Sequence, residues 1–481
     1  MRLKHFSELR VAACFELKLM RRDPAVWLVL ALLLAAIVQA LVSGRAVVEA
    51  RERAVAVMQD AEAKQRAELV TQIEAIESGR IAAPDRFYRD PRNAFAVSNR
   101  IGPTAALPPV PLALVAAGAG EAFPPAVRLR AGSKDSFLFT EEINNPAHLS
   151  AGTFDLVFVL VFVLPLCLLA LTYNLVSGER EQGTFSLNAA SPASLATVFG
   201  GKLLVRGGLP VGVTLVAVNA GIALATYSSH ALPLVSLIWL SLLVVAYASF
   251  WLALAAFVNA LRRDSALNAL TLVGAWLVFV LLIPAFSTAL SEATYPAPPR
   301  AEVILASRSA AIDAERDRAA EEARYRDEYG ETAAKTAGKV DERTRMLQRI
   351  AVQTIATERA DAVLARHDAR VDEQARLAAR LAFLSPAMLA EAAMIDLSGN
   401  GRARYRQFEA ALDTFHREWR DFFIAERAAR SLPLTRADYD RLPRFSVREK
   451  APESLLPATA AVVFLLAALM LASYYVRSLG R

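Results

Sequence analysis

The sequence lacks the residue patterns that enzymes use for catalysis. Its five histidines form no HExxH pair, and no GxSxG nucleophile motif is present. Each of its two Gly-Lys pairs, at residues 201–202 and 338–339, is followed by an aliphatic residue. A P-loop needs Ser or Thr there, because the hydroxyl holds the magnesium of the nucleotide. We therefore predict that the chain is not an enzyme and does not itself hydrolyse ATP.

The cysteines and histidines support neither metal binding nor disulfide formation. The two cysteines, Cys14 and Cys167, are far apart in sequence and fall in or beside apolar segments. This arrangement excludes a disulfide framework and a cysteine metal site. We expect no metal site and no cofactor in this chain.

The informative spacing lies in residues 179–185, Glu-Arg-Glu-Gln-Gly-Thr-Phe, after a long apolar run. Two acids and a base leave the run together, and Gly183 and Thr184 can turn the chain and cap a short helix. That helix would show Phe185 and Leu187 among polar neighbours until Pro192, and would act as a rigid lever between two apolar runs. An ordinary amphipathic connector is the simpler interpretation of the same residues.

The apolar runs themselves indicate membrane spans. Hydrophobic residues make up 55% of the 481 residues and charged residues 21%, and long stretches carry no charge. A bilayer core about 30 Å thick needs roughly 20 apolar residues of helix. Six spans result, at 24–44, 153–178, 201–227, 233–261, 265–291 and 454–476. The uncharged stretch 101–120 is rejected because its four prolines would strip hydrogen bonds from a helix in lipid.

Charge placement predicts the orientation of these spans. Lys and Arg cluster before the first span, between the second and third, between the fourth and fifth, and after the sixth. The positive-inside rule makes that side cytoplasmic, so both termini face the cytoplasm of a multi-pass protein in the inner (plasma) membrane. A cleaved signal peptide is the alternative for the start of the chain, but the first run is long and no small-residue cleavage site follows it.

Two large insertions, 45–152 and 292–453, then lie outside the cytoplasm. The first reads as a small mixed α/β domain, and the second as mainly long helices with a break between Gly330 and Gly338. The first carries 13 basic and 13 acidic residues and the second 28 and 28. The formal net charge of +6 therefore belongs to the spans and their inner rim, and we expect no nucleic-acid partner.

Amides inside the apolar runs offer the other candidate site. Asn174, Asn219, Asn259 and Asn268 lie within or at the ends of spans, where an unpaired amide is costly. Hydrogen bonding between helices explains them most simply. A translocation path lined by Asn174 and Asn219 is the functional alternative.

Residues 179–184, followed by Ser191-Pro192 and Gly201-Lys202, resemble the signature of ABC-2 type permeases, the membrane subunits of one class of ABC transporter. In that family such a segment forms the coupling helix that docks onto the ATPase. The resemblance implies coupling roles for Glu179, Arg180, Glu181, Gln182, Gly183, Thr184 and Phe185. Phe185 stands where the family often has Leu, and Asn188-Ala-Ala190 replaces a more apolar stretch.

The likeness extends to the architecture. Residues 1–23 are similar to the family's interfacial elbow helix, and one subfamily carries large insertions like those of this chain. The resemblance implies an all-α integral membrane protein with a cytoplasmic coupling segment at 179–200 and a cytoplasmic tail at 477–481. It also implies a homodimer or a heterodimer with a paralogous permease, over an ABC ATPase subunit that binds ATP and magnesium.

Two functions remain open on this evidence. The first is a permease, embedded in membrane lipid, that couples ATP hydrolysis in the ATPase subunit to export of a substrate. The same coupling could instead drive conformational work on a periplasmic or envelope protein. The second is a membrane-anchored scaffold that displays two extracytoplasmic interaction domains and needs no ATPase. The inner loop distinguishes them, because only the permease needs an acidic lever after the second span.

Overall fold

The computed structural model describes residues 2–84, 86, 89–121, 123–131, 154–190, 194–226, 234–299, 302, 304–306, 308–310, 312–317, 342–423, 433–446 and 456–479. These residues are mostly helical. Six helices are long and apolar enough to cross a membrane, which confirms the predicted number of spans. The described strands are β1 (Thr104–Ala106) and β2 (Ala126–Arg128), an antiparallel pair with Ala105 opposite Val127.

The spans are helical throughout, because in a bilayer each backbone polar group must find its partner within the segment. Three of them are single helices near the middle and end of the chain: α11 (Leu195–Thr226), α12 (Leu234–Ala260) and α20 (Leu456–Leu479). The second span joins α7 (Leu156–Phe158), η3 (Val159–Val163), α8 (Leu164–Thr172) and α9 (Ser177–Glu181). The fifth joins α13 (Ser265–Leu277), η5 (Val278–Leu282) and α14 (Ile283–Thr294).

The first span is the beginning of a much longer helix. After α1 (Arg2–Met20), Asp23 caps α2 (Pro24–Glu77) by accepting a hydrogen bond from the Ala25 amide at 2.9 Å. At 1.5 Å per residue, the 54 residues of α2 extend about 80 Å, far more than a bilayer requires. The helix passes the predicted end of the span at residue 44 and continues to Glu77, as the proline-free composition of residues 45–78, rich in Ala, Glu, Arg and Gln, predicts.

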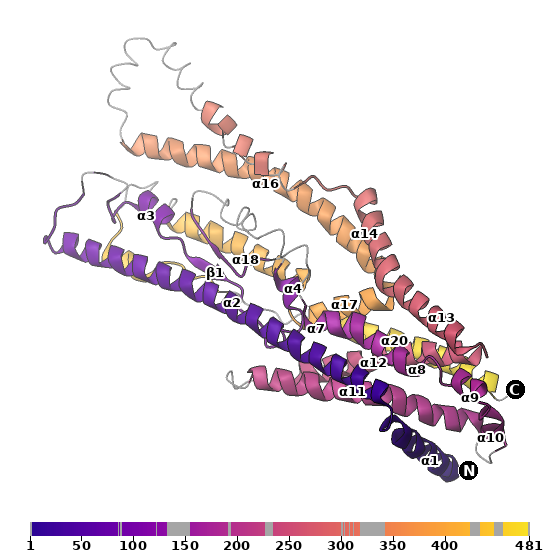
Figure 1. Ribbon diagram of the computed structural model, residues 1–481. Coiled ribbons are helices and arrows are strands. Elements are labelled where there is room, and N and C mark those ends of the chain that lie inside the picture. Colours follow the sequence, from indigo (N-terminus) through magenta and orange to yellow (C-terminus); the bar gives the residue numbers. More distant parts are fainter. Residues whose placement is uncertain are drawn as a thin grey trace.

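The elements divide between two ends of the span bundle (Figure 1). At one end, which we call the loop side, lie α1, α9, α10 (Phe185–Ala189) and the end of α20. At the other end, the insertion side, lie the extension of α2 and the helices of the second insertion. The predicted lever and the predicted outer domains thus occupy opposite ends of the bundle.

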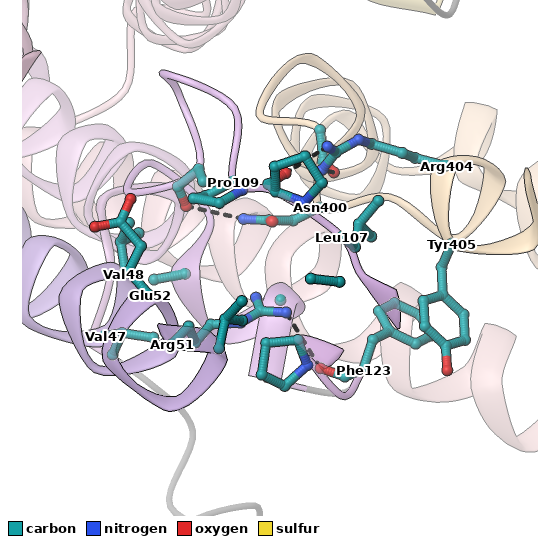
Figure 2. A pocket seen from close by; sticks show the side chains of 18 of the residues that line it. Val47, Val48, Arg51, Glu52, Leu107, Pro109, Phe123, Asn400, Arg404 and Tyr405 are labelled. Atoms are coloured by element: carbon teal, nitrogen blue, oxygen red, sulfur yellow. Dashed lines mark hydrogen bonds between the residues drawn. The ribbon is translucent and has the colours of Figure 1, made fainter. Parts of the chain in front are cut away.

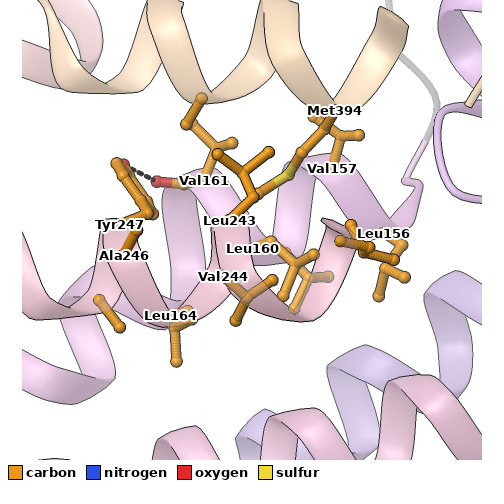
Figure 3. Close-up of a cluster of buried hydrophobic side chains, with 14 of the residues drawn as sticks. Leu156, Val157, Leu160, Val161, Leu164, Leu243, Val244, Ala246, Tyr247 and Met394 are labelled. Carbon is orange, nitrogen blue, oxygen red and sulfur yellow. Dashed lines mark hydrogen bonds between the residues drawn. The ribbon is translucent and has the colours of Figure 1, made fainter. Parts of the chain in front are cut away.

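Close packing between spans forms the main core. Leu160, Leu243 and Tyr247 are fully buried and join the second span to α12 (Figure 3). Tyr247 also meets Phe464 of α20, with ring centroids 5.4 Å apart. The second span and α12 are the most buried spans, so they form the centre of the bundle.

The π-helical turn η3 is stabilised by side chains of neighbouring spans. Pro165 follows it and has no backbone N–H, so a preceding carbonyl loses its usual helical partner. The Tyr247 hydroxyl donates to the Val161 carbonyl at 3.0 Å, and the Trp276 indole donates to the Phe162 carbonyl at 3.2 Å. These bonds satisfy backbone groups that lipid could not.

One helix of the second insertion packs against the spans. Helix α17 (Pro386–Leu397) follows the 3-10 turn η6 (Ala382–Leu384), and its Ala390 and Met394 belong to the core of the bundle (Figure 3). Ser385 caps α17 and also donates its hydroxyl to the Phe279 carbonyl in η5 of the fifth span. Residues 292–453, predicted as a domain beyond the membrane, thus include a helix seated on the span bundle.

The two insertions share a second hydrophobic core, and we call this unit the insertion lobe. From the first insertion it contains Leu69 and Ile73 of α2, part of α3 (Ala94–Arg100) and both strands. From the second it contains the aromatic face of α18 (Arg402–Arg420) and residues in and around α19 (Arg436–Asp440). Phe408, Phe415 and Trp419 lie on that face, as the helical spacing predicts.

The remaining helices complete the second insertion. Helix α16 (Glu342–Leu381) is a long helix of the kind expected there, and it contacts α14 at the end of the fifth span. Arg406 of α18 pairs with Asp372 of α16 at 2.6 Å. The break predicted between Gly330 and Gly338 lies outside the described residues.

Candidate functional site

The loop between the second and third spans forms two short helices around a glycine turn. Helix α9 ends at Glu181, Gly183 adopts a φ of +74°, and α10 begins at Phe185. That left-handed conformation favours glycine, as the predicted turn requires. Thr184 does not cap α10, and its hydroxyl donates to the Glu179 carbonyl at 3.2 Å. Pro192, expected to end the helix, lies outside the described residues.

The Glu179 side chain lies between the two short helices and the third span and holds the loop in place. Its carboxylate is half-buried and accepts hydrogen bonds from the Thr184 hydroxyl and, at 3.0 Å, from the Asn188 amide. It also accepts one from the Lys202 ammonium, whose side chain is 9% exposed at the start of α11. Glu179 therefore ties α9, α10 and the third span together.

A second buried carboxylate connects the same network to α1. Glu16 is fully buried, and its carboxylate lies 2.5 Å from the Arg206 guanidinium and 3.9 Å from the Lys202 ammonium. Arg206 also donates to the Asn174 amide oxygen at 2.9 Å. We call this set of Glu16, Asn174, Glu179, Lys202 and Arg206 the charged junction. It links α1, the loop-side end of the second span and the third span, and ion pairs buried to this degree need good geometry to persist.

The second acid of the loop binds the fifth span. The Glu181 carboxylate accepts the Ser265 amide at 2.7 Å and its hydroxyl at 2.9 Å, at the first residue of α13. A carboxylate is favoured there by the partial positive charge of a helix N-terminus. Arg180 donates to the Arg262 carbonyl in the turn between α12 and α13. Both contacts extend the loop's attachments to a further span.

These contacts sort the predicted coupling residues into two groups. Glu179, Arg180, Glu181 and Thr184 bind other parts of this chain, and Phe185 packs half-buried on Phe199 with ring centroids 6.1 Å apart. The second group faces outward and consists of Gln182 and Gly183, which the following residues Ser186 and Leu187 extend along α10. Leu187 is 72% exposed and is the large apolar side chain of this group of four residues.

The candidate path residues make hydrogen bonds of the kind that hold spans together. Asn174 belongs to the charged junction, and Asn219 donates to the Ser241 hydroxyl of α12 at 3.0 Å. Asn259 donates to the Thr172 carbonyl at 3.0 Å and accepts the Val176 amide at 3.1 Å. Lining of a translocation path by Asn174 and Asn219 stays a prediction.

Sequence reasoning did not assign roles to Glu16, Lys202 and Arg206. Two signals were available. Glu16 is one of two acids in the first helix and lies between Phe15 and Leu17, and Lys202 and Arg206 stand four residues apart, on one face of the third span near its loop-side end. An acid and two bases at the same predicted membrane depth indicate a buried network.

Comparison with known proteins identifies one part of the chain. A family described as "Domain of unknown function (DUF3526)" matches residues 300–448, within the second insertion. No curated protein and no solved structure matches the chain. The chain is therefore a multi-pass membrane protein whose second insertion contains a DUF3526 domain.

Proposed function

We propose that this chain is the permease subunit of an ABC-2 type ABC transporter, and that α10 docks onto a separate ATPase subunit. Two sets of contacts support this: the charged junction fastens the loop to α1 and to the second and third spans, and Glu181 fastens it to the fifth, while Leu187 faces outward. A simple connector between spans needs no such fastening. A lever does, because a displacement at its tip reaches the spans only if the loop moves as one body.

The contacts suggest how motion would pass. ATP and magnesium bind in the partner, and closure of the partner displaces α10. Glu179 transmits that displacement to α11 through Lys202, and Glu16 carries it on to α1. Glu181 carries it to α13 through Ser265. The spans then shift between two arrangements whose populations depend on the nucleotide.

The wider assembly follows from the same proposal. Two copies, or this chain and a paralogue, would form the transport unit in the inner membrane, with the loop side and both termini in the cytoplasm. The insertion lobe would face the opposite compartment and act on the exported substrate or an envelope partner. Asn174 and Asn219 would then lie along the moving spans.

Replacement of the outward leucine tests the docking surface. Leu187→Ala should weaken co-purification with the P-loop ATPase about tenfold, because a central apolar contact contributes about 1.4 kcal/mol or more at an interface. The matched control is Leu270→Ala, which truncates a leucine of similar exposure, 69% against 72%, on α13. Equal retention of the ATPase by both variants would contradict docking through α10.

A second variant separates docking from transmission. Glu179→Gln keeps the shape of the side chain and removes the charge that holds Lys202. We expect the ATPase to remain bound while the stimulation of its turnover by the permease falls. If wild-type protein retains no P-loop ATPase at all, the chain is a membrane-anchored scaffold instead.

A further inference from the structure

A pocket of about 210 Å³ lies where the insertion lobe meets the span bundle (Figure 2). Three segments form it. One face of α2 contributes Val47, Arg51 and Val55, the first insertion contributes nine residues between Ala106 and Pro125, and the third segment runs from Gly399 in the turn after α17 to Tyr405 in the first turn of α18. Each segment is joined to a different span or to the helix seated on the bundle.

The walls of the pocket are mainly apolar. Alanine, valine, leucine and proline side chains of α2 and the first insertion line most of it, and Phe123 and Tyr405 stack at one side with ring centroids 4.2 Å apart. A pocket lined in this way favours an apolar ligand. A polar group that entered it would lose its hydrogen bonds to water and find few replacements in the walls.

Polar side chains at the pocket are bound to backbone and fix its shape. The Asn400 amide donates to the carbonyls of Ala113 and Ala116 at 2.8 and 2.9 Å. Arg404 donates to the Pro108 carbonyl at 2.6 Å, and Arg51 donates to the Phe123 carbonyl at 3.2 Å. The pocket is thus formed in advance, and a ligand need not order its walls.

The position of the pocket along α2 relates it to the bilayer. Gly44 packs against the Leu114 carbonyl and is the last buried residue of the span. At 1.5 Å per residue, Val47 lies about 5 Å beyond Gly44 and Gln59 about 22 Å beyond it. The headgroup layer of one leaflet is roughly 5–8 Å thick. The pocket therefore begins at headgroup level and extends away from the membrane.

We propose that this pocket binds the hydrocarbon chain of a membrane amphiphile that is partly lifted out of the leaflet on the insertion side. A cavity of about 150 Å³ accommodates benzene, so this pocket has room for a chain end of about eight carbons. The polar head of the amphiphile would sit at the exposed rim formed by Glu52 and Gln59 of α2. The site does not depend on the proposed ATPase coupling, because no residue of the charged junction takes part.

Photolabelling of the full-length protein in lipid nanodiscs tests the site. The probe is a twelve-carbon fatty acid with a diazirine at its chain end, and labelled residues are mapped by peptide mass spectrometry. Labelling is expected in residues 47–59, 106–125 and 399–405. Ala56→Phe fills the pocket and should reduce that labelling at least about fivefold. Ala54→Phe makes the same change on an exposed residue of α2 outside the pocket and should leave it unchanged.

A second substitution distinguishes a filled pocket from a misfolded protein. Ala56→Leu adds a smaller volume and should reduce labelling less than Ala56→Phe does, which keeps the test valid if the larger variant folds poorly. Labels confined to the lipid-facing surfaces of the spans, or equal labelling of all variants, would overturn the proposal. Absence of labels from these three segments in the wild-type protein would overturn it as well.

Discussion

The two ends of the molecule are held together by different forces. On the loop side, ion pairs and hydrogen bonds among Glu16, Glu179, Lys202 and Arg206 join three elements. On the insertion side, the lobe is held by an apolar core in which Phe408 and Phe415 both pack edge-on against Phe445, and Phe415 also lies against Trp419. One end depends on a few directional bonds and the other on packed volume.

That difference has a mechanical meaning. A packed aromatic core resists deformation, because any shift opens voids and forfeits many contacts at once. A charged junction can exchange partners: the Lys202 ammonium already lies within 4.0 Å of both Glu16 and Glu179. The loop side is therefore suited to adjust between states, and the insertion lobe to move as a rigid body.

The largest expected effect removes packed volume from the insertion lobe. Trp419 is 1% exposed and donates its indole N–H to the Ser98 carbonyl at 3.3 Å. Trp419→Ala should lower the free energy of unfolding of the lobe by about 3–5 kcal/mol, because it leaves a large cavity and removes the hydrogen bond from the indole to the Ser98 carbonyl. Thermal melting of the full-length protein, with limited proteolysis of the second insertion, measures the loss.

If the two ends are mechanically separate, the loss of stability caused by Trp419→Ala should be confined to the insertion lobe. Trp419→Ala should retain the ATPase at temperatures below the melting of the lobe. Trp239→Ala, which truncates a tryptophan of α12 that is 36% exposed, should melt nearly as wild type does. Loss of the ATPase at low temperature would show that the two ends are not mechanically separate.

A smaller effect is expected from the charged junction. Glu16→Gln removes a fully buried carboxylate and leaves the Arg206 guanidinium without its anion. Breaking a buried pair from one side costs about 3 kcal/mol, which here acts on the docking of α1 rather than on the whole fold. Proteolysis between α1 and α2 should accelerate, and stimulation of the ATPase should fall.

A double variant identifies the cause. Glu16→Gln combined with Arg206→Gln removes both charges, so the penalty of the stranded guanidinium disappears and part of the protection of α1 should return. Additive losses in the double variant would mean that the two side chains act independently. The charged junction would then not be one unit.

The sequence predicted most of the bundle and less of its connections. Uncharged runs and the positions of prolines identified six spans, because a bilayer imposes a length and a helical backbone on each of them. The buried face of α18 likewise follows from sequence, because Phe408, Leu412, Phe415 and Trp419 recur at the spacing of one helix face. Each of these features depends on residues close together in the chain.

Features that depend on distant residues were not predictable in the same way. The pairing of Glu16 with Arg206 spans 190 residues, and the core shared by the two insertions unites Leu69 with Trp419. The seating of α17 was missed because a 12-residue apolar helix is too short for a span and reads as an ordinary core helix. Patterns along one chain segment indicate which face is apolar, but do not identify its partner.

The helix α17 stands between the two ends and carries one ionisable side chain toward the bundle. Burial, together with the nearby Asp155 carboxylate, raises the pKa of Glu391 above its ordinary value of 4.5. Asp155 itself caps α7 by accepting the Phe158 amide at 3.0 Å, and also accepts the Gly118 amide at 3.1 Å. Two carboxylates, Glu391 and Asp155, therefore lie near each other where the first insertion, the second span and α17 come together.

The smallest expected effect is a pH dependence of the seating of α17. Since the folded protein raises the pKa of Glu391, protonation stabilises the seated helix; this stabilisation is complete below pH 4.5 and is lost as the pH rises through the raised value. Glu391→Gln cannot ionise, so it should melt at a higher temperature than wild type at pH 8 and show a weaker pH dependence. Glu373→Gln, which removes an acid paired with Arg370 on the surface of α16, should leave the dependence intact. If Glu391→Gln follows the wild-type melting curve at every pH, α17 is held by its apolar face alone, and the packed end of the molecule extends down to the spans.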